Sequence, residues 1–304
     1  MQYFIGIDGG GSRSRLVAID KDKAIIARLE GSSTNITAET YEGVFNNIQN
    51  LLREFCVAAG VSLEGCQSLC IGSAGASTGD NEKLLEKIFR DIGIKGKIKV
   101  INDAELVLMA ATGEEPGIII IAGTGSVGYA IDKDGATYRA GGWGHLIDDG
   151  GSGYRIGIDA IKAALMDLDG RGQKTVLTSA VAEFFGQTDP VQILGYIYSN
   201  SFHKSKIAKI AKLVEEAAKQ GDNVANTIEI TAAKDLTALA YALIHKAQLF
   251  AHKIVLNGGI ILHNQNIRTM FESSICEAFP NMQIVPMSES AELGAAYIAF
   301  KNML

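Results

Sequence analysis

An internal repeat constrains the fold of this chain more than any other feature of its sequence. Shifted by 112 residues, segment 11–24 (GSRSRLVAIDKDKA) aligns with segment 123–136 (GTGSVGYAIDKDGA) with eight identities in fourteen positions. In each copy an apolar strand runs into a turn of glycines and hydroxyl residues, and a second strand ends in an Asp-Lys-Asp turn, which predicts a hairpin. Each copy therefore marks the opening of one domain.

Strands and helices alternate after the first copy of the repeat. Apolar residues recur at helical spacing over residues 41–55 and 84–92, and the strand-like segments SLCI and KIKVIN lie between and after them. This order predicts an α/β fold. The turn residues TGEEPG lie between two apolar blocks and divide the chain into domains 1–114 and 115–304.

The second half predicts mainly helices. We expect helices over residues 155–168, 174–186, 205–219, 223–250 and 266–277, strands at KIVLN and MQIVP, and a last helix over about 289–304.

Composition excludes several classes of protein. The chain has 304 residues, 47% of them hydrophobic, and a net charge of -6 with no basic run, so a folded protein without a nucleic-acid partner is expected. No apolar run is long enough to cross a membrane, and the start MQYFIGID lacks the order of a signal peptide, so we expect a cytoplasmic location and no membrane partner. The spacing of the four cysteines predicts reduced thiols rather than disulfides or metal ligands.

The two glycine turns have a chemical interpretation. A turn free of side chains lets backbone N–H groups converge on phosphate oxygens, and Ser or Thr hydroxyls add donors. Neither turn has the spacing of a P-loop or a Rossmann motif. Asp8 precedes the first turn, where its carboxylate could hold Mg²⁺ directly or through water, or could form an Asx turn.

The set of motifs resembles a known family over essentially the whole chain. The order GIDGGGSRS, STN, SAGA, NDA, AGTGS, GGWGHLIDDGGSGY and LNGG is similar to that of the N-acetylglucosamine kinases and the BadF-type ATPases grouped with them. The resemblance implies the fold of the sugar kinase, heat-shock chaperone and actin superfamily. In that fold two ribonuclease-H-like domains, each with a five-stranded mixed sheet and helices, close over ATP, and the last helix often packs back on the first domain.

The resemblance also implies site residues. Asp103 matches the catalytic base, which would accept the proton of a sugar hydroxyl. The positions implied for ATP and its phosphates are Gly10, Gly11, Ser12, Gly123, Thr124, Gly125, Ser126, Gly258 and Gly259. Those implied for the sugar are Asn35, Ser73, Ala74, Asp103, Gly142, Trp143 and Asp149.

The sequence leaves alternatives open at several of these positions. Asp103 follows a strand and precedes a helix, which suits a ligand-facing carboxylate but also a helix N-cap. Trp143, the single tryptophan, could stack on a sugar ring or anchor a core or an interface. Of Arg13 and Arg15, we expect at most one to face the first turn.

The sequence thus predicts an ATP- and Mg²⁺-dependent kinase of N-acetylglucosamine or N-acetylmuramic acid, acting at O6 and forming a homodimer. Glucosamine is the alternative substrate. One rival function is a BadF-type ATPase that activates another enzyme, although such activators carry paired cysteines and this chain offers only Cys66 and Cys70. The other is a noncatalytic sugar-responsive regulator. One departure is that the family usually has G-D-E-G-S where this chain has Asp148, Asp149, Gly150, Gly151 and Ser152, so the glutamate is missing.

Overall fold

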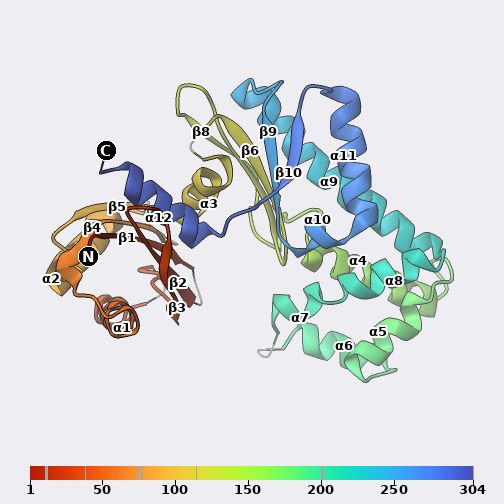
Figure 1. Cartoon of the computed structure of the whole chain (residues 1–304). Helices are drawn as coiled ribbons and strands as arrows, with labels where there is room; N and C mark the ends of the chain where they lie inside the picture. The colour runs from red at the N-terminus through yellow and green to blue at the C-terminus, as the bar shows by residue number, and fades with distance from the viewer. Residues whose placement is uncertain are drawn as a thin grey trace. The chain divides into compact units, whose positions relative to one another are not determined.

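The chain forms two compact units, described here from a computed structural model. The structure describes residues 1–10, 13–37, 39–73, 75–76, 78–113, 115–199 and 202–303. Unit 1 comprises Met1–Glu115 and Met287–Leu304, and unit 2 comprises Pro116–Pro286. The chain therefore leaves unit 1 once and returns to it for its last helix (Figure 1).

Unit 1 is built on a five-stranded mixed sheet. Its strands are β1 (Tyr3–Gly9), β2 (Arg13–Asp20), β3 (Ile25–Ser32), β4 (Cys66–Ser73) and β5 (Lys97–Asn102), in the order β3-β2-β1-β4-β5. The first three strands are antiparallel neighbours, whereas β1, β4 and β5 run parallel. The carboxyl ends of these parallel strands consequently meet at one edge of the sheet.

Helices cover both faces of this sheet. The helices of unit 1 are α1 (Tyr41–Ala59), α2 (Asn81–Ile92), α3 (Asp103–Thr112) and α12 (Ala291–Lys301), with a short 3-10 turn η1 (Leu63–Gly65). One core lies between the sheet and α1 and α2, and a second core lies on the opposite face with α3 and α12 (Figure 1). Side chains alternate between these cores along each strand, as the pleat requires.

Unit 2 repeats the same sheet topology. Its strands are β6 (Gly117–Ala122), β7 (Ser126–Ile131), β8 (Thr137–Gly141), β9 (Lys253–Asn257) and β10 (Gln283–Pro286), in the order β10-β9-β6-β7-β8. Read from the other edge, this is the order of unit 1. The two predicted hairpins are confirmed, and the Asp-Lys-Asp turns are equivalent: the Oδ1 atoms of Asp20 and Asp132 each accept two backbone N–H bonds at 2.9 Å. The expected α/β fold with two five-stranded mixed sheets is thereby confirmed.

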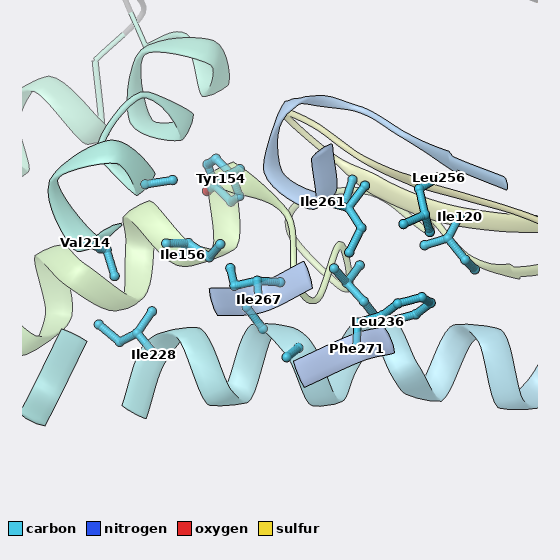
Figure 2. Close-up of a cluster of buried hydrophobic side chains, with 14 of the residues drawn as sticks. Ile120, Tyr154, Ile156, Val214, Ile228, Leu236, Leu256, Ile261, Ile267 and Phe271 are labelled. Atoms are coloured by element: carbon cyan, nitrogen blue, oxygen red, sulfur yellow. The ribbon is translucent and has the colours of Figure 1, made fainter. Parts of the chain in front are cut away.

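The remaining helices belong to unit 2. They are α4 (Gly153–Leu168), α5 (Leu177–Phe185), α6 (Pro190–Ile197), α7 (Lys204–Ala208), α8 (Ala211–Lys219), α9 (Asn223–Ala247), α10 (Gly259–His263) and α11 (Gln265–Ala278). Leu236 of α9 and Phe271 of α11 lie side by side in the core of this unit, and Ile120 and Leu256 contribute the sheet's side of it (Figure 2).

Two predictions for unit 2 differ from the structure. The prediction of a single helix over residues 205–219 is wrong. The structure has two helices, α7 and α8, which are separated at Lys209 and Ile210. There the N–H groups bond three residues back rather than four, and both Ile207 and Ile210 are buried. Helix α6 was not predicted, although Asp189 caps it and Pro190 begins it. Among the described residues, no helix is long and apolar enough to cross a membrane.

Candidate functional site

The carboxyl edge of the unit 1 sheet brings several predicted residues together. Register pairs Gly9 of β1 with Ser73 of β4, and Ser73 with Asn102 of β5. Asp8 and Gly10 flank the end of β1, and Asp103 follows β5 directly. Open α/β sheets bind ligands at this edge, because the strand ends present loops and helix starts there. Gly11, Ser12 and Ala74, which were also predicted for this region, lie outside the described residues.

The Ser-Thr-Asn turn after β3 is fastened to the same edge. The hydroxyl of Ser73 is fully buried and donates to the carbonyl of Thr34 at 3.0 Å, and the Ser33 hydroxyl donates to the carbonyl of Gly10 at 3.4 Å. Asn35 is partly exposed, and its Oδ1 accepts hydrogen bonds from the backbone N–H and the hydroxyl of Thr37. Ser73, predicted to touch the sugar, therefore acts on the turn that carries Asn35.

Two half-buried carboxyl groups lie at this edge. Burial raises the pKa of Asp8; Glu292 and Asp103 raise it further, whereas Arg15, 3.9 Å from Oδ2, opposes the shift. Burial also raises the pKa of Asp103, while a backbone N–H bond opposes this change. A raised carboxyl pKa favours proton acceptance near neutral pH, as a general base requires.

The N-cap interpretation of Asp103 is resolved by its neighbour. Asn102 is the N-cap of α3, and its Oδ1 accepts the N–H of Ala104 at 2.9 Å. Asp103 is the first helical residue, and its Oδ1 lies 3.0 Å from the same N–H. Asn102 therefore fills the cap position, and Asp103, whose Oδ1 also accepts the Ala104 N–H, keeps its second carboxylate oxygen for other chemistry.

In unit 2 the glycine turn is tied to the start of a long helix. The N–H groups of Gly153 and Tyr154 donate to the carbonyls of Gly123 and Thr124, at 2.8 and 3.2 Å. The first donors of α4 thus hold the turn in place, and the Thr124 side chain remains exposed. The buried hydroxyl of Ser126 donates to the carbonyl of Gly150 at 2.7 Å, and the predicted role of this residue in phosphate binding stays a prediction.

The Gly258-Gly259 motif lies against this turn. Gly258 has a φ of 97°, and a Cβ on it would come within 2.5 Å of the carbonyl oxygen of Ala122 and 2.9 Å of the nitrogen of Gly123. Only glycine allows this backbone approach. The structure therefore places the predicted adenosine motif, whose second glycine begins α10, beside the predicted phosphate turn.

The glycine-rich loop after β8 carries the remaining predicted residues. Trp143 is 68% exposed, so a core role for it is excluded; the Arg139 guanidinium lies over its ring at 4.6 Å. Gly142, at a φ of 71°, precedes it, and the Trp143 N–H donates to Asp148 Oδ2 at 3.3 Å. Asp149 is buried with a φ of 62°, and a Cβ on Gly125 would stand 3.0 Å from its Oδ2. The Asp149 side chain thus packs against the glycine turn at Gly125, whereas the Trp143 side chain projects from the loop.

Cys66 and Cys70 lie on opposite faces of the unit 1 sheet. Cys66 packs in the core beneath α1 and α2, and Cys70 packs in the core beneath α3 and α12. The strand is irregular between them, since Tyr3 pairs with Cys66 but Phe4 pairs with Ser68. Burial raises the pKa of Cys66 to about 12, so this thiol stays protonated. Two sulfurs on opposite faces cannot ligate one cluster.

Three residues near the site were not predicted from the sequence. Asn102 caps α3, Ser33 fastens the turn to Gly10, and Glu292 influences Asp8 from the far end of the chain. The dipeptide Asn-Asp before an apolar run signalled a cap, but either residue could have filled it. Glu292 left no signal, because nothing in its spacing relates it to Asp8.

Arg13 and Arg15 are two residues apart in β2 and therefore share a face, and both lie within 3.7 Å of Glu30. That at most one of them faces the first turn stays a prediction.

Comparisons with known proteins agree with this arrangement. Residues 5–299 match the model of the BadF/BadG/BcrA/BcrD ATPase family. An N-acetylmuramic acid/N-acetylglucosamine kinase of Clostridium acetobutylicum is 37% identical over 301 residues, 98% of either chain. An N-acetyl-D-glucosamine kinase of Dictyostelium discoideum is 30% identical over 316 residues, covering 99% of this chain and 98% of the relative. A solved structure from Chromobacterium violaceum, whose proposed identity is N-acetylglucosamine kinase, is 26% identical with a TM-score of 0.76, covering 98% of this chain and 99% of that one.

Proposed function

The chain belongs to the BadF/BadG/BcrA/BcrD ATPase family, and we propose that within it the protein is an ATP-dependent kinase of N-acetylglucosamine, N-acetylmuramic acid or both. The γ-phosphoryl group goes to a sugar hydroxyl, which we assign as O6. The reaction takes place in the cytoplasm, where ATP is supplied. That the protein forms a homodimer stays a prediction.

The carboxyl edge of unit 1 supplies the acceptor chemistry. Asp103 accepts the proton of the sugar hydroxyl while the oxygen bonds to the γ-phosphorus and the bond from that phosphorus to ADP breaks. Asn35, held in its turn through the buried bond from Ser73 to Thr34, hydrogen-bonds sugar hydroxyls. These donors and acceptors orient the sugar, which contributes much of the rate in phosphoryl transfer.

The glycine turn of unit 2 supplies phosphate recognition. Gly123, Gly125 and the exposed hydroxyl of Thr124 form a surface on which phosphate oxygens can be hydrogen-bonded. Gly258 lets the segment that begins α10 lie against this turn, and we assign Gly258 and Gly259 to the nucleoside. Trp143 offers an exposed ring face for the sugar, and Asp149 braces the turn.

Asp8 is the residue we assign to Mg²⁺. Its carboxylate is a hard oxygen donor, half-buried at the end of β1. An oxygen donor of this kind fits Mg²⁺. When bound, the ion neutralises phosphate charge during transfer.

The observation that carries the proposal is the Asp103 carboxyl group at the strand end, relieved of capping by Asn102. The test is product identification after incubation with ATP and N-acetylglucosamine. We expect a sugar monophosphate whose phosphorus couples to the two C6 protons in an NMR spectrum. Coupling to the C1 proton would contradict the O6 assignment, and free phosphate without a phosphosugar would contradict the kinase.

A further inference from the structure

The start of α12 carries an acidic side chain that the proposed chemistry leaves without a defined task. Glu292 lies in the first turn of this helix and is 6% exposed. Its Oε1 lies 3.5 Å from Nη1 of Arg28, whereas its Oε2 is buried and has no hydrogen-bond partner among the described residues. Leaving a buried carboxylate oxygen unpaired is costly, so a group outside the described chain is expected to satisfy it.

Packing of α12 on β1 brings Glu292 to Asp8. A Cβ on Gly6 would overlap the backbone oxygen of Glu292 and the backbone nitrogen of Ala296, so the helix start lies directly on the strand at Gly6. Asp8 is two residues further along β1, and its side chain projects from the same face. The two carboxyl groups therefore occupy one region.

The neighbouring arginines do not neutralise this pair fully. Arg15 is 3.9 Å from Asp8 but also contacts Glu30 at 3.6 Å, and its side chain is 37% exposed. Arg28 lies 3.5 Å from Oε1 of Glu292, and its side chain is half exposed. Among the described residues, the Oε2 atom of Glu292 thus has no hydrogen-bond partner.

We propose that Glu292 is a second carboxylate for the divalent cation held by Asp8, binding it directly or through a metal-bound water. The inference rests on the proposed function, which assigns Mg²⁺ to Asp8. Mg²⁺ is typically held by one or two carboxylates, with water and substrate phosphates completing the shell.

The role of Glu292 is tested by titrating the full chain with Mn²⁺ in the presence of ADP. Electron paramagnetic resonance measures the affinity for Mn²⁺ in this titration. We expect Glu292→Gln to weaken Mn²⁺ binding by at least about tenfold, as loss of a ligand or of its supporting partner does. ADP binding without metal should be unchanged. Glu289→Gln is the matched control, because it removes an exposed carboxylate three residues away, and it should leave Mn²⁺ binding unchanged.

A second pair of measurements separates a ligand from a structural ion pair. If Glu292 serves the cation, Glu292→Gln raises or preserves the metal-free melting temperature, because it removes a buried charge beside Asp8. Arg28→Gln then leaves Mn²⁺ binding near that of the wild type. A lower metal-free melting temperature for Glu292→Gln, with an equal loss of Mn²⁺ binding in Arg28→Gln, would overturn the inference.

The role of Asp8 is tested in the same series. Asp8→Asn should weaken Mn²⁺ binding as well. If it does and Glu292→Gln binds Mn²⁺ like the wild type, the inference about Glu292 fails and the proposed function stands. If Asp8→Asn has no effect, the cation assignment in the proposed function fails, and the inference fails with it.

Discussion

At the scale of single residues, the division of tasks between Asn102 and Asp103 matters most. Asn102 takes the helix cap, so the neighbouring carboxyl group keeps its second oxygen for other chemistry. The same division recurs at Ser73 and Asn35, where the buried hydroxyl holds a turn and the amide lies partly exposed on it. In both places one polar residue stabilises the local structure and its neighbour is presented at the surface.

Asp103→Asn tests whether the carboxylate is a base. The amide keeps the size of the side chain but cannot accept a proton, so turnover should fall by at least about a hundredfold. The melting temperature should be unchanged or slightly higher, because Asn102 still caps α3 and a buried charge is gone. Steady-state kinetics and thermal unfolding check both. As a control, Asn102→Ala should lower stability by about 1 kcal/mol. Near-normal turnover in Asp103→Asn would reduce Asp103 to a structural residue.

The pH dependence of kcat/KM should report the same group. Burial raises the pKa of Asp103 above its ordinary value of 3.8. Below that raised pKa the carboxyl group is protonated and cannot accept the hydroxyl proton, so activity falls as pH decreases through it. The midpoint of the decrease in kcat/KM at low pH should therefore lie above pH 3.8. The residual activity of Asp103→Asn should not show this decrease. A limb that persists in the variant would belong to another group.

At the scale of elements, the placement of α12 decides how unit 1 is built. The helix comes from the end of the chain yet covers the central strands of the first sheet, and it can approach because glycines stand at both contacts. The backbone of α12 packs directly on Gly6 of β1, and Gly294 of α12 packs against Ala110 of α3. The expectation that the last helix packs on the first domain rested on a resemblance. Its contact points could not be read from spacing, because they join residues that lie far apart in the sequence.

Gly294→Ala should destabilise the protein by about 1 to 3 kcal/mol, because its methyl group would lie 2.8 Å from the Ala110 Cα and force α3 and α12 apart. Gly195→Ala is the control. Gly195 lies within α6 and a methyl group there meets nothing within 4 Å, so that variant should gain about 0.5 to 1 kcal/mol from helix propensity. Urea unfolding of the two variants checks the sign of each change. Equal effects would mean that α12 does not need the close contact.

At the scale of the whole molecule, the two units share one sheet topology but carry different sets of helices. Both units have the same strand order, and the repeated segments form the same hairpin and the same Asp turn. The repeat predicted these parts because local sequence encodes them. It could not predict the break between α7 and α8 or the meeting of Glu292 with Asp8, because tertiary packing decides both. The sequence also could not predict that the buried hydroxyls of Ser73 and Ser126 donate to loop carbonyls, because burial of a hydroxyl is not visible in a local pattern.

ADP release measured across a panel of free sugars tests the central claim most directly. The panel contains N-acetylglucosamine, N-acetylmuramic acid, glucosamine and glucose, with a sugar-free reaction as the baseline. We predict that one or both N-acetylated sugars raise ADP release well above that baseline and above the rates with glucosamine and glucose. Equal release with every sugar and with none would contradict the kinase, and a clear preference for glucosamine would contradict the assigned substrate.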